Sequence, residues 1–206
     1  EGSNKAMDKR FVDLRSGKNG KARIKILKGH FATKNSHVNT YIDMSTVKTR
    51  HNNARETAKT LAEEYMTNTP VETIVCLKNT EVIGAFMAEY LSGSGNASVS
   101  AGNNISVVTP EFDPAGQILF RDNNQRMIEG KQVLVLTDSM STGSLVRQAI
   151  ESVLYYGGRV SGICAVFSSI SKVAGMEVKT IFTSADLPDY QVYNSQIGRA
   201  SCRERV

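Results

Sequence analysis

The stretch VLVLTDSMSTGSL, Val133 to Leu145, decides the fold of this chain. It begins with four consecutive apolar residues, a run typical of a strand that is buried on both faces of a parallel sheet. Thr137 and the carboxylate Asp138 follow the run, and small hydroxyl residues and Gly143 then lead into a segment of helical composition that closes at Gly157. We therefore expect a buried strand, a tight turn and a covering helix here.

Apolar runs of the same kind occur on both sides of this stretch, with helical segments between them. The runs are TIVCL (73–77), ISVVT (105–109), VSGICAVF (160–167) and EVKTIF (177–182), and the helical segments are 47–66 and 81–91. Strands that alternate with helices predict an α/β fold with a mostly parallel sheet flanked by helices on both faces.

The segment between the second and third strands interrupts this alternation. PEFDPAGQILFRDNNQRMIEG, Pro110 to Gly130, contains two prolines and polar clusters around one short apolar island. We expect a β-hairpin or flap, because long excursions from a strand end often cover a binding site. Arg121 and Arg126 are the cations that this flap would bring to a ligand.

The ends of the chain differ in character from its centre. We expect residues 1–28 to be a partly ordered lead-in with one short helix around Lys9 to Arg15, followed by a single domain over 29–196. The last ten residues, IGRASCRERV (197–206), resemble a translated sequencing adapter, so we treat them as non-native and expect native sequence to continue beyond Gln196.

The charge and the cysteines argue against several classes of protein. Of the formal net charge of +5, the tail contributes +2, and the remaining +3 is too small to indicate nucleic-acid binding. No apolar run is long enough for a membrane span or a secretory signal, so we expect a cytoplasmic protein. Cys76 and Cys164 lie in apolar runs without a second ligand nearby, which predicts buried, reduced thiols and no protein-held metal.

Small residues at the start of a helix allow backbone N–H groups to converge on an anion, and the helix dipole favours a phosphate. Asp138 is unsuited to the phosphate itself, and its natural partner is a pair of neutral hydroxyls, as on a ribose. One alternative is an ordinary junction in which Ser141 or Thr142 caps the helix. A second alternative is that Asp138 accepts a phosphate, but the further acidic metal ligands that this chemistry needs are not evident. A nucleoside-triphosphate loop is not expected here either, because such a loop has a lysine after its glycine and none follows Gly143.

This segment resembles the 5-phosphoribosyl 1-diphosphate motif of type I phosphoribosyltransferases, with Asp138 at the second of two acids. Thr137 stands where the first acid is usual, and Ser144 stands where a second glycine is common. The resemblance implies that Asp138 is catalytic, since it would hold the ribose. It implies a phosphoribosyl diphosphate site made of Thr137, Asp138, Ser139, Met140, Ser141, Thr142, Gly143, Ser144 and Leu145.

A second segment, GHFATKNSHVNTYIDM (29–44), is similar to the N-terminal hood segment of orotate phosphoribosyltransferases. The matching residues are Phe31, Lys34, Asn35, Ser36 and Tyr41. The resemblance places Lys34 near orotate and diphosphate, which are both anions; the alternative is a solvated loop lysine. The closing ADLPDYQVY (185–193) is also of a kind seen near the end of some members.

Other positions depart from that family. The loop LKNTE (77–81) lacks the expected glycines, Glu81 would repel a leaving diphosphate, and no lysine lies between Lys78 and Lys131. The resemblance still implies transfer of phosphoribose to orotate by a homodimer, with Mg²⁺ carried on the diphosphate. The charge and the apolar runs predict that the protein binds neither nucleic acid nor membrane. Two alternatives remain: a phosphoribosyl diphosphate-binding sensor with weakened catalysis, and a phosphoribosyltransferase for another base.

Overall fold

The apolar runs of the sequence pair into one central sheet in this computed structural model, which describes residues 11–18, 20–32, 36–93, 95, 97–187 and 189–194. The sheet has the order β10-β11-β9-β8-β4-β5, and all its neighbours are parallel except the edge pair β10 and β11. Its strands are β4 (Thr73–Cys76), β5 (Ser106–Val108), β8 (Gln132–Met140), β9 (Arg159–Ser168), β10 (Lys172–Val173) and β11 (Met176–Thr183). The predicted α/β class is confirmed.

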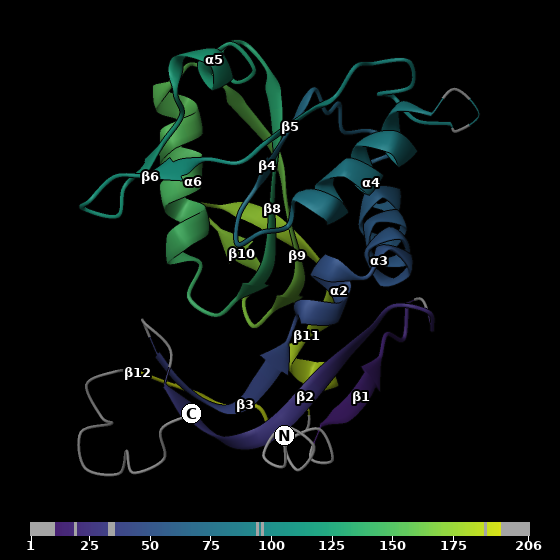
Figure 1. Ribbon diagram of the computed structural model, residues 1–206, viewed down its shortest axis with the longest axis vertical. Coiled ribbons are helices and arrows are strands. Elements are labelled where there is room, and N and C mark those ends of the chain that lie inside the picture. The colour runs from purple at the N-terminus through teal and green to yellow at the C-terminus, as the bar shows by residue number, and fades with distance from the viewer. Residues whose placement is uncertain are drawn as a thin grey trace.

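Helices cover both faces of this sheet (Figure 1). α3 (His51–Glu63) and α4 (Glu81–Ser92) lie on one face, and α6 (Ser144–Tyr155) lies on the other. Successive residues of β4 point to opposite sides: Ile74 and Cys76 join the apolar cluster that contains α3 and α4, and Val75 joins the cluster that contains α6. Burial on both faces explains why these strands are unbroken apolar runs.

Two details of the core bear on the sequence-based predictions. The helix predicted over 47–66 is divided into α2 (Ser45–Thr49) and α3, because Arg50 between them has an extended backbone with φ −92° and ψ 116°.

Cys76 and Cys164 are buried and free, as predicted. Burial raises the pKa of the Cys76 thiol to about 12 and also raises that of Cys164, so both remain protonated thiols.

A second, antiparallel sheet lies opposite the carboxyl ends of the central strands, and we call it the hood sheet (Figure 1). It has the order β1-β2-β3-β12 and consists of β1 (Val12–Arg15), β2 (Arg23–Ala32), β3 (Ser36–Asp43) and β12 (Val192–Asn194). The helix predicted around Lys9 to Arg15 is therefore wrong, since 12–15 pair with β2 as a strand. The signal for β2 was its period of two, in which buried Ile24 and Ile26 alternate with more exposed residues.

The segment 110–130 begins with the expected hairpin. β6 (Glu111–Phe112) pairs with β7 (Ile118–Leu119), and the short helix α5 (Asp122–Gln125) follows. The base of the hairpin is fixed, because Ile118 and Phe120 are buried and the Ser152 hydroxyl of α6 donates a hydrogen bond of 3.1 Å to the Ile118 carbonyl. A 3-10 turn at Ser184–Asp186 follows β11 on the way to the hood sheet. In the described part of the chain, every helix is too short or too polar to cross a membrane.

Candidate functional site

A cavity of about 1790 Å³ lies between the hood sheet and the carboxyl ends of the central strands. Its hood wall is partly aromatic and includes Phe31 and Tyr41, whose ring centroids are 5.7 Å apart. Tyr190, which stacks edge-on against Phe167, adds to this wall. The opposite wall is polar and is made by the loop between β8 and α6. One cavity thus offers flat apolar surfaces on one side and hydrogen-bonding groups on the other.

Gly143 shapes the loop between β8 and α6. It is the N-cap of α6 and has a left-handed backbone, with φ 74°, and no side chain makes a capping hydrogen bond. A Cβ atom at this position would lie 2.8 Å from a methyl of Val173 and 2.9 Å from one of Ile170, so the loop requires glycine. Neither Ser141 nor Thr142 caps the helix in this structure, contrary to the alternative interpretation of this junction. The first-turn amides of α6, which have no acceptor within the helix, begin at the cavity wall.

Most of the residues predicted to bind phosphoribosyl diphosphate line this cavity. They are Thr137, Ser139, Met140, Ser141, Thr142, Gly143, Ser144 and Leu145. Thr137 is distinctive among them, because its side chain is buried and its hydroxyl has no hydrogen-bond partner in the structure. A buried polar group without a partner is costly, so the Thr137 hydroxyl, which is next to the cavity but itself almost without accessible surface, is a candidate for ligand binding.

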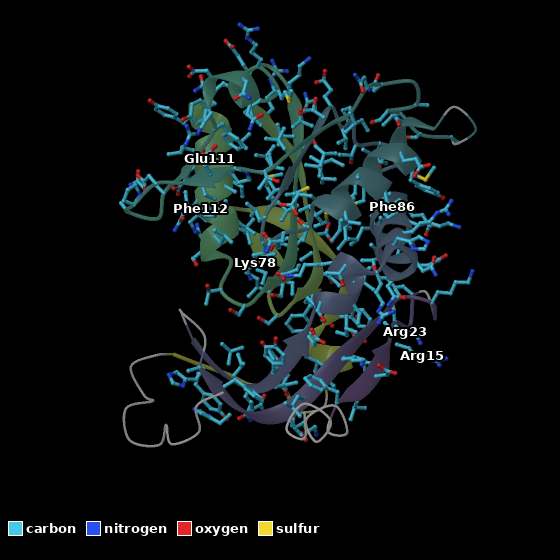
Figure 2. The ribbon with its side chains drawn as sticks, viewed as in Figure 1. Arg15, Arg23, Lys78, Phe86, Glu111 and Phe112 are labelled. Carbon is cyan, nitrogen blue, oxygen red and sulfur yellow. The ribbon has the colours of Figure 1, made fainter. Side chains whose placement is uncertain are left out.

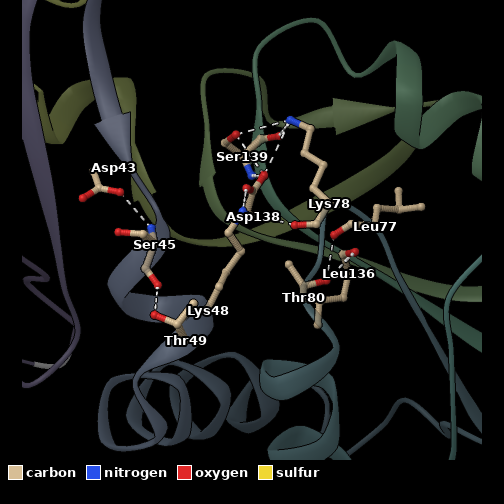
Figure 3. A network of polar contacts seen from close by, with 10 residues as sticks. All are labelled: Asp43, Ser45, Lys48, Thr49, Leu77, Lys78, Thr80, Leu136, Asp138 and Ser139. Carbon is tan, nitrogen blue, oxygen red and sulfur yellow. Dashed lines mark hydrogen bonds and ion pairs between the residues drawn. The ribbon is translucent and has the colours of Figure 1, made fainter.

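Asp138 is the one residue of the predicted phosphoribosyl diphosphate site that does not line the cavity. Figure 3 shows its contacts with Lys48, Lys78 and Ser139. The Asp138 side chain is 8% exposed and is engaged by two lysines from other parts of the chain. The Lys48 ammonium of α2 lies 2.9 Å from Oδ2, and the Lys78 ammonium lies 3.6 Å from Oδ1. The Ser139 hydroxyl also donates to Oδ1, at 3.0 Å. In this structure Asp138 is therefore a counter-ion for two ammonium groups.

Lys78 stands two residues after the end of β4, and its side chain reaches the loop after β8. Its ammonium donates to the Ser139 carbonyl at 2.7 Å and lines the cavity, and Figure 2 shows it between the central sheet and the hood sheet. Lys78 and Asn79 both have left-handed backbones, with φ 54° and 58°, although neither is glycine. The Lys48 ammonium donates to the Lys78 carbonyl at 3.2 Å, which helps to hold this strained turn.

Sequence reasoning missed Lys48 and Lys78 as site residues. Lys78 could have been found, because it stands at the carboxyl end of a predicted buried strand, where ligands of α/β sheets bind. Lys48 could not, since 90 positions separate it from Asp138 and its helix carries no distinguishing pattern.

The two flap arginines do not line the cavity. Arg121 pairs with Glu111 across the hairpin at 2.6 Å. Arg126 follows α5 at the opposite end of the central sheet, in a small polar pocket with Glu72 and Lys131 (Figure 1). The predicted flap brings Phe112 to the cavity instead, together with the turn at Ala115 and Gly116.

Two other predicted positions can be compared with the structure. Glu81 does not line the cavity, and its carboxylate accepts a hydrogen bond of 2.9 Å from the Thr109 hydroxyl. The repulsion of a leaving group expected from Glu81 therefore finds no support in its position. Lys34 and the tail Ile197–Val206 lie outside the described residues.

The side chains at this site do not suit a protein-bound divalent cation. Within the described ranges, His, Cys, Asp and Glu form no group of three or more that could hold a metal ion. Asp43 is the one carboxylate that lines the cavity in that part of the chain, and it already accepts a hydrogen bond of 2.9 Å from the Ser45 amide. Mg²⁺ prefers several oxygen ligands, and the Lys78 ammonium would repel it.

Comparison with solved structures finds the same fold in phosphoribosyltransferases. Leishmania donovani UMP synthase matches with a TM-score of 0.56 and 18% identity, over 79% of this chain and 34% of that one. Mycobacterium tuberculosis orotate phosphoribosyltransferase, in complex with Fe(III) dicitrate, matches with a TM-score of 0.55 and 17% identity, over 80% and 93% of the two chains. Rhodothermus marinus adenine phosphoribosyltransferase matches with a TM-score of 0.50 and 13% identity, over 87% of this chain and 97% of that one.

These comparisons show the fold alone. The central sheet with its flanking helices is that of phosphoribosyltransferases, and structures of orotate and adenine enzymes both match it. This chain spans about a third of the UMP synthase chain. A scan against protein-family models finds no match, and a search of curated proteins finds none either.

Proposed function

We propose that this chain binds 5-phosphoribosyl 1-diphosphate and transfers its phosphoribosyl group to a ring nitrogen of a planar base, with orotate as the first candidate. The observation that carries the proposal is the loop after β8. Its helix N-terminus has no side-chain cap, is shaped by Gly143 and faces a cavity large enough for a nucleotide. The fold shared with phosphoribosyltransferases supports the same conclusion.

Each wall of the cavity has a role in this reaction. The amides and hydroxyls of Ser141–Leu145 bind the 5′-phosphate, the unpartnered Thr137 hydroxyl binds the ribose, and the Lys78 ammonium neutralises the diphosphate. The base lies against the aromatic hood wall. The bond between ribose C1 and diphosphate oxygen breaks as diphosphate leaves with the electron pair, and C1 forms a bond to the base nitrogen, which loses its proton to the leaving diphosphate or to water. Such a reaction needs positioning and charge neutralisation more than a nucleophilic side chain.

Asp138 is paired with two lysines and does not line the cavity, which makes it less available to a ribose. We propose that its first role is to fix the two ammonium groups. Lys34, if it reaches the cavity from the hood, would favour an anionic base such as orotate. A homodimer, and Mg²⁺ carried on the diphosphate, remain expectations from the resemblance, and a cytoplasmic location remains an expectation from the sequence.

The test is a panel of bases with one preparation. Purified protein, phosphoribosyl diphosphate and either orotate, uracil, adenine or hypoxanthine are incubated, and the nucleotide monophosphate is measured by chromatography. We expect orotidine 5′-phosphate as the main product. A product from adenine or hypoxanthine alone would contradict the choice of orotate and keep the reaction type.

A second candidate is a sensor that binds phosphoribosyl diphosphate without efficient turnover. The observation that favours it concerns the two positions where the phosphoribosyl diphosphate motif usually has acids. The first is Thr137, and the second, Asp138, is paired with lysines. Calorimetry separates the two candidates. Saturable binding of phosphoribosyl diphosphate with no product from any base supports the sensor, and the absence of binding in a folded protein contradicts both.

A further inference from the structure

The carboxyl edge of the central sheet carries an excess of positive charge where the cavity begins. One carboxylate, Asp138, is matched with two ammonium groups, so the cluster has a net charge of +1 (Figure 3). The two lysines differ in exposure: the Lys48 side chain is 21% exposed and the Lys78 side chain 41% exposed. Lys48 is therefore committed to the protein, and Lys78 is the charge that a ligand can reach.

We infer that Lys78, held in place by Lys48 and Asp138, takes the role of a divalent cation on the diphosphate, so that this chain binds phosphoribosyl diphosphate without metal. This inference rests on the proposed function and adds to it how the diphosphate charge is neutralised. Lys78 contacts the ligand, and Lys48 is a positioning residue.

The geometry supports this role because the ammonium is fixed before any ligand arrives. The turn that carries Lys78 has two left-handed residues in succession and is tied at both ends. The Lys48 ammonium donates to the Lys78 carbonyl at 3.2 Å, and the Thr80 hydroxyl donates to the Leu77 carbonyl at 2.8 Å. A charge that is already oriented needs no reorganisation when the diphosphate binds or leaves.

The distribution of acids points the same way. Thr137 replaces a possible acidic ligand with a neutral hydroxyl, and Asp138 is withdrawn from the cavity by its two ion pairs. A cation that approached the diphosphate here would meet the Lys78 ammonium and, among the described residues of the wall, a single carboxylate, Asp43, which already accepts a hydrogen bond from the Ser45 amide. The charge balance thus favours a lysine over a metal ion.

The experiment measures phosphoribosyl diphosphate binding by calorimetry in EDTA and again in Mg²⁺. For the native sequence we expect the affinity in EDTA and the affinity in Mg²⁺ to agree within about threefold. In EDTA, Lys78→Met should lose about tenfold or more in affinity, as expected for a lost charged hydrogen bond, and Mg²⁺ should restore part of it. This variant should fold, because Asp138 keeps Lys48 as its partner.

Matched variants separate the inferred role from a general effect of charge. Lys131→Met removes a lysine of similar exposure, 44%, that pairs with Glu72 away from the cavity, and it should bind as the native chain does. Lys78→Arg keeps the charge and should keep binding in EDTA. Lys48→Met should weaken binding in EDTA and gain a dependence on Mg²⁺, which a merely structural lysine would not produce.

The outcomes distinguish this inference from the proposed function. Binding of the native chain that requires Mg²⁺ overturns the inference and leaves the proposed function standing. Equal metal independence of the native chain and of Lys78→Met also overturns it, because the lysine would then be dispensable. A folded protein that binds the ligand in neither buffer overturns both.

Discussion

Gly143 meets two separate requirements at one position, a left-handed backbone and the absence of a side chain. Ile170 lies in the turn after β9 and Val173 lies in β10, so the loop between β8 and α6 is packed against the rest of the fold and does not stand free. Thr137, one strand position before Asp138, shows the opposite situation, a polar atom that the fold buries without a partner. Both residues give predictions that separate stability from binding.

Gly143→Ala should damage both stability and binding. The left-handed backbone costs about 1 kcal/mol or more for a residue with a Cβ atom, and the close methyl groups add about 1–3 kcal/mol of overpacking. Urea denaturation measures the loss. Gly102→Ala is the matched control, since Gly102 has a φ of 79° and open space around it. If the two variants lose equal stability, the packing account of the loop is wrong.

Thr137→Val should leave stability unchanged or raise it by about 1 kcal/mol, because it removes a buried hydroxyl that has no partner. Affinity for phosphoribosyl diphosphate should fall about threefold to tenfold through the lost hydrogen bond to the ribose. Thr57→Val, in α3, removes another such hydroxyl away from the cavity and should change stability alone. Unaltered affinity in Thr137→Val would show that its hydroxyl does not contact the ligand.

At the scale of the elements, the parallel strands were predictable and the hood was predictable only in part. Strands buried on both faces leave an unbroken apolar run, and β4, β8, β9 and β11 all follow such runs closely. The hood sheet is buried on one face, so its sequence signal is the alternation of apolar and polar residues in a lysine-rich segment, as in RIKI (23–26). The break at Arg50 has no glycine or proline to mark it.

The hairpin β6 and β7 gives a prediction at the same scale. Phe112 is 53% exposed and lines the cavity, so it contributes little to the core and can cover a bound ligand. Phe112→Ala should change the free energy of unfolding by less than about 0.5 kcal/mol and lower affinity or turnover. Val99→Ala, at a residue that is 50% exposed and does not line the cavity, is the control. Equal activity of the two variants would remove the hairpin from the mechanism.

At the scale of the whole molecule, the site is made by segments that are distant in sequence. The hood sheet, the loop after β4, the hairpin and the loop after β8 all reach one cavity. The loop after β8 was predictable, because strand, turn and helix are contiguous there. The pairing of Lys48 with Asp138 was not predictable, because it depends on how the hood sheet and α2 pack against the carboxyl end of the central sheet. Arg126 was misassigned to the site for the same reason, because its helix lies at the other end of that sheet.

The proposed function depends most on the binding of a sugar phosphate by the backbone amides at the start of α6. The direct measurement is a titration of ¹⁵N-labelled protein with ribose 5-phosphate, followed by amide chemical shifts. We predict saturable shifts concentrated on Ser141–Leu145, with smaller shifts at Thr137 and Lys78. Unchanged amides at Ser141–Leu145 at a saturating concentration, or shifts confined to another region, would contradict the account.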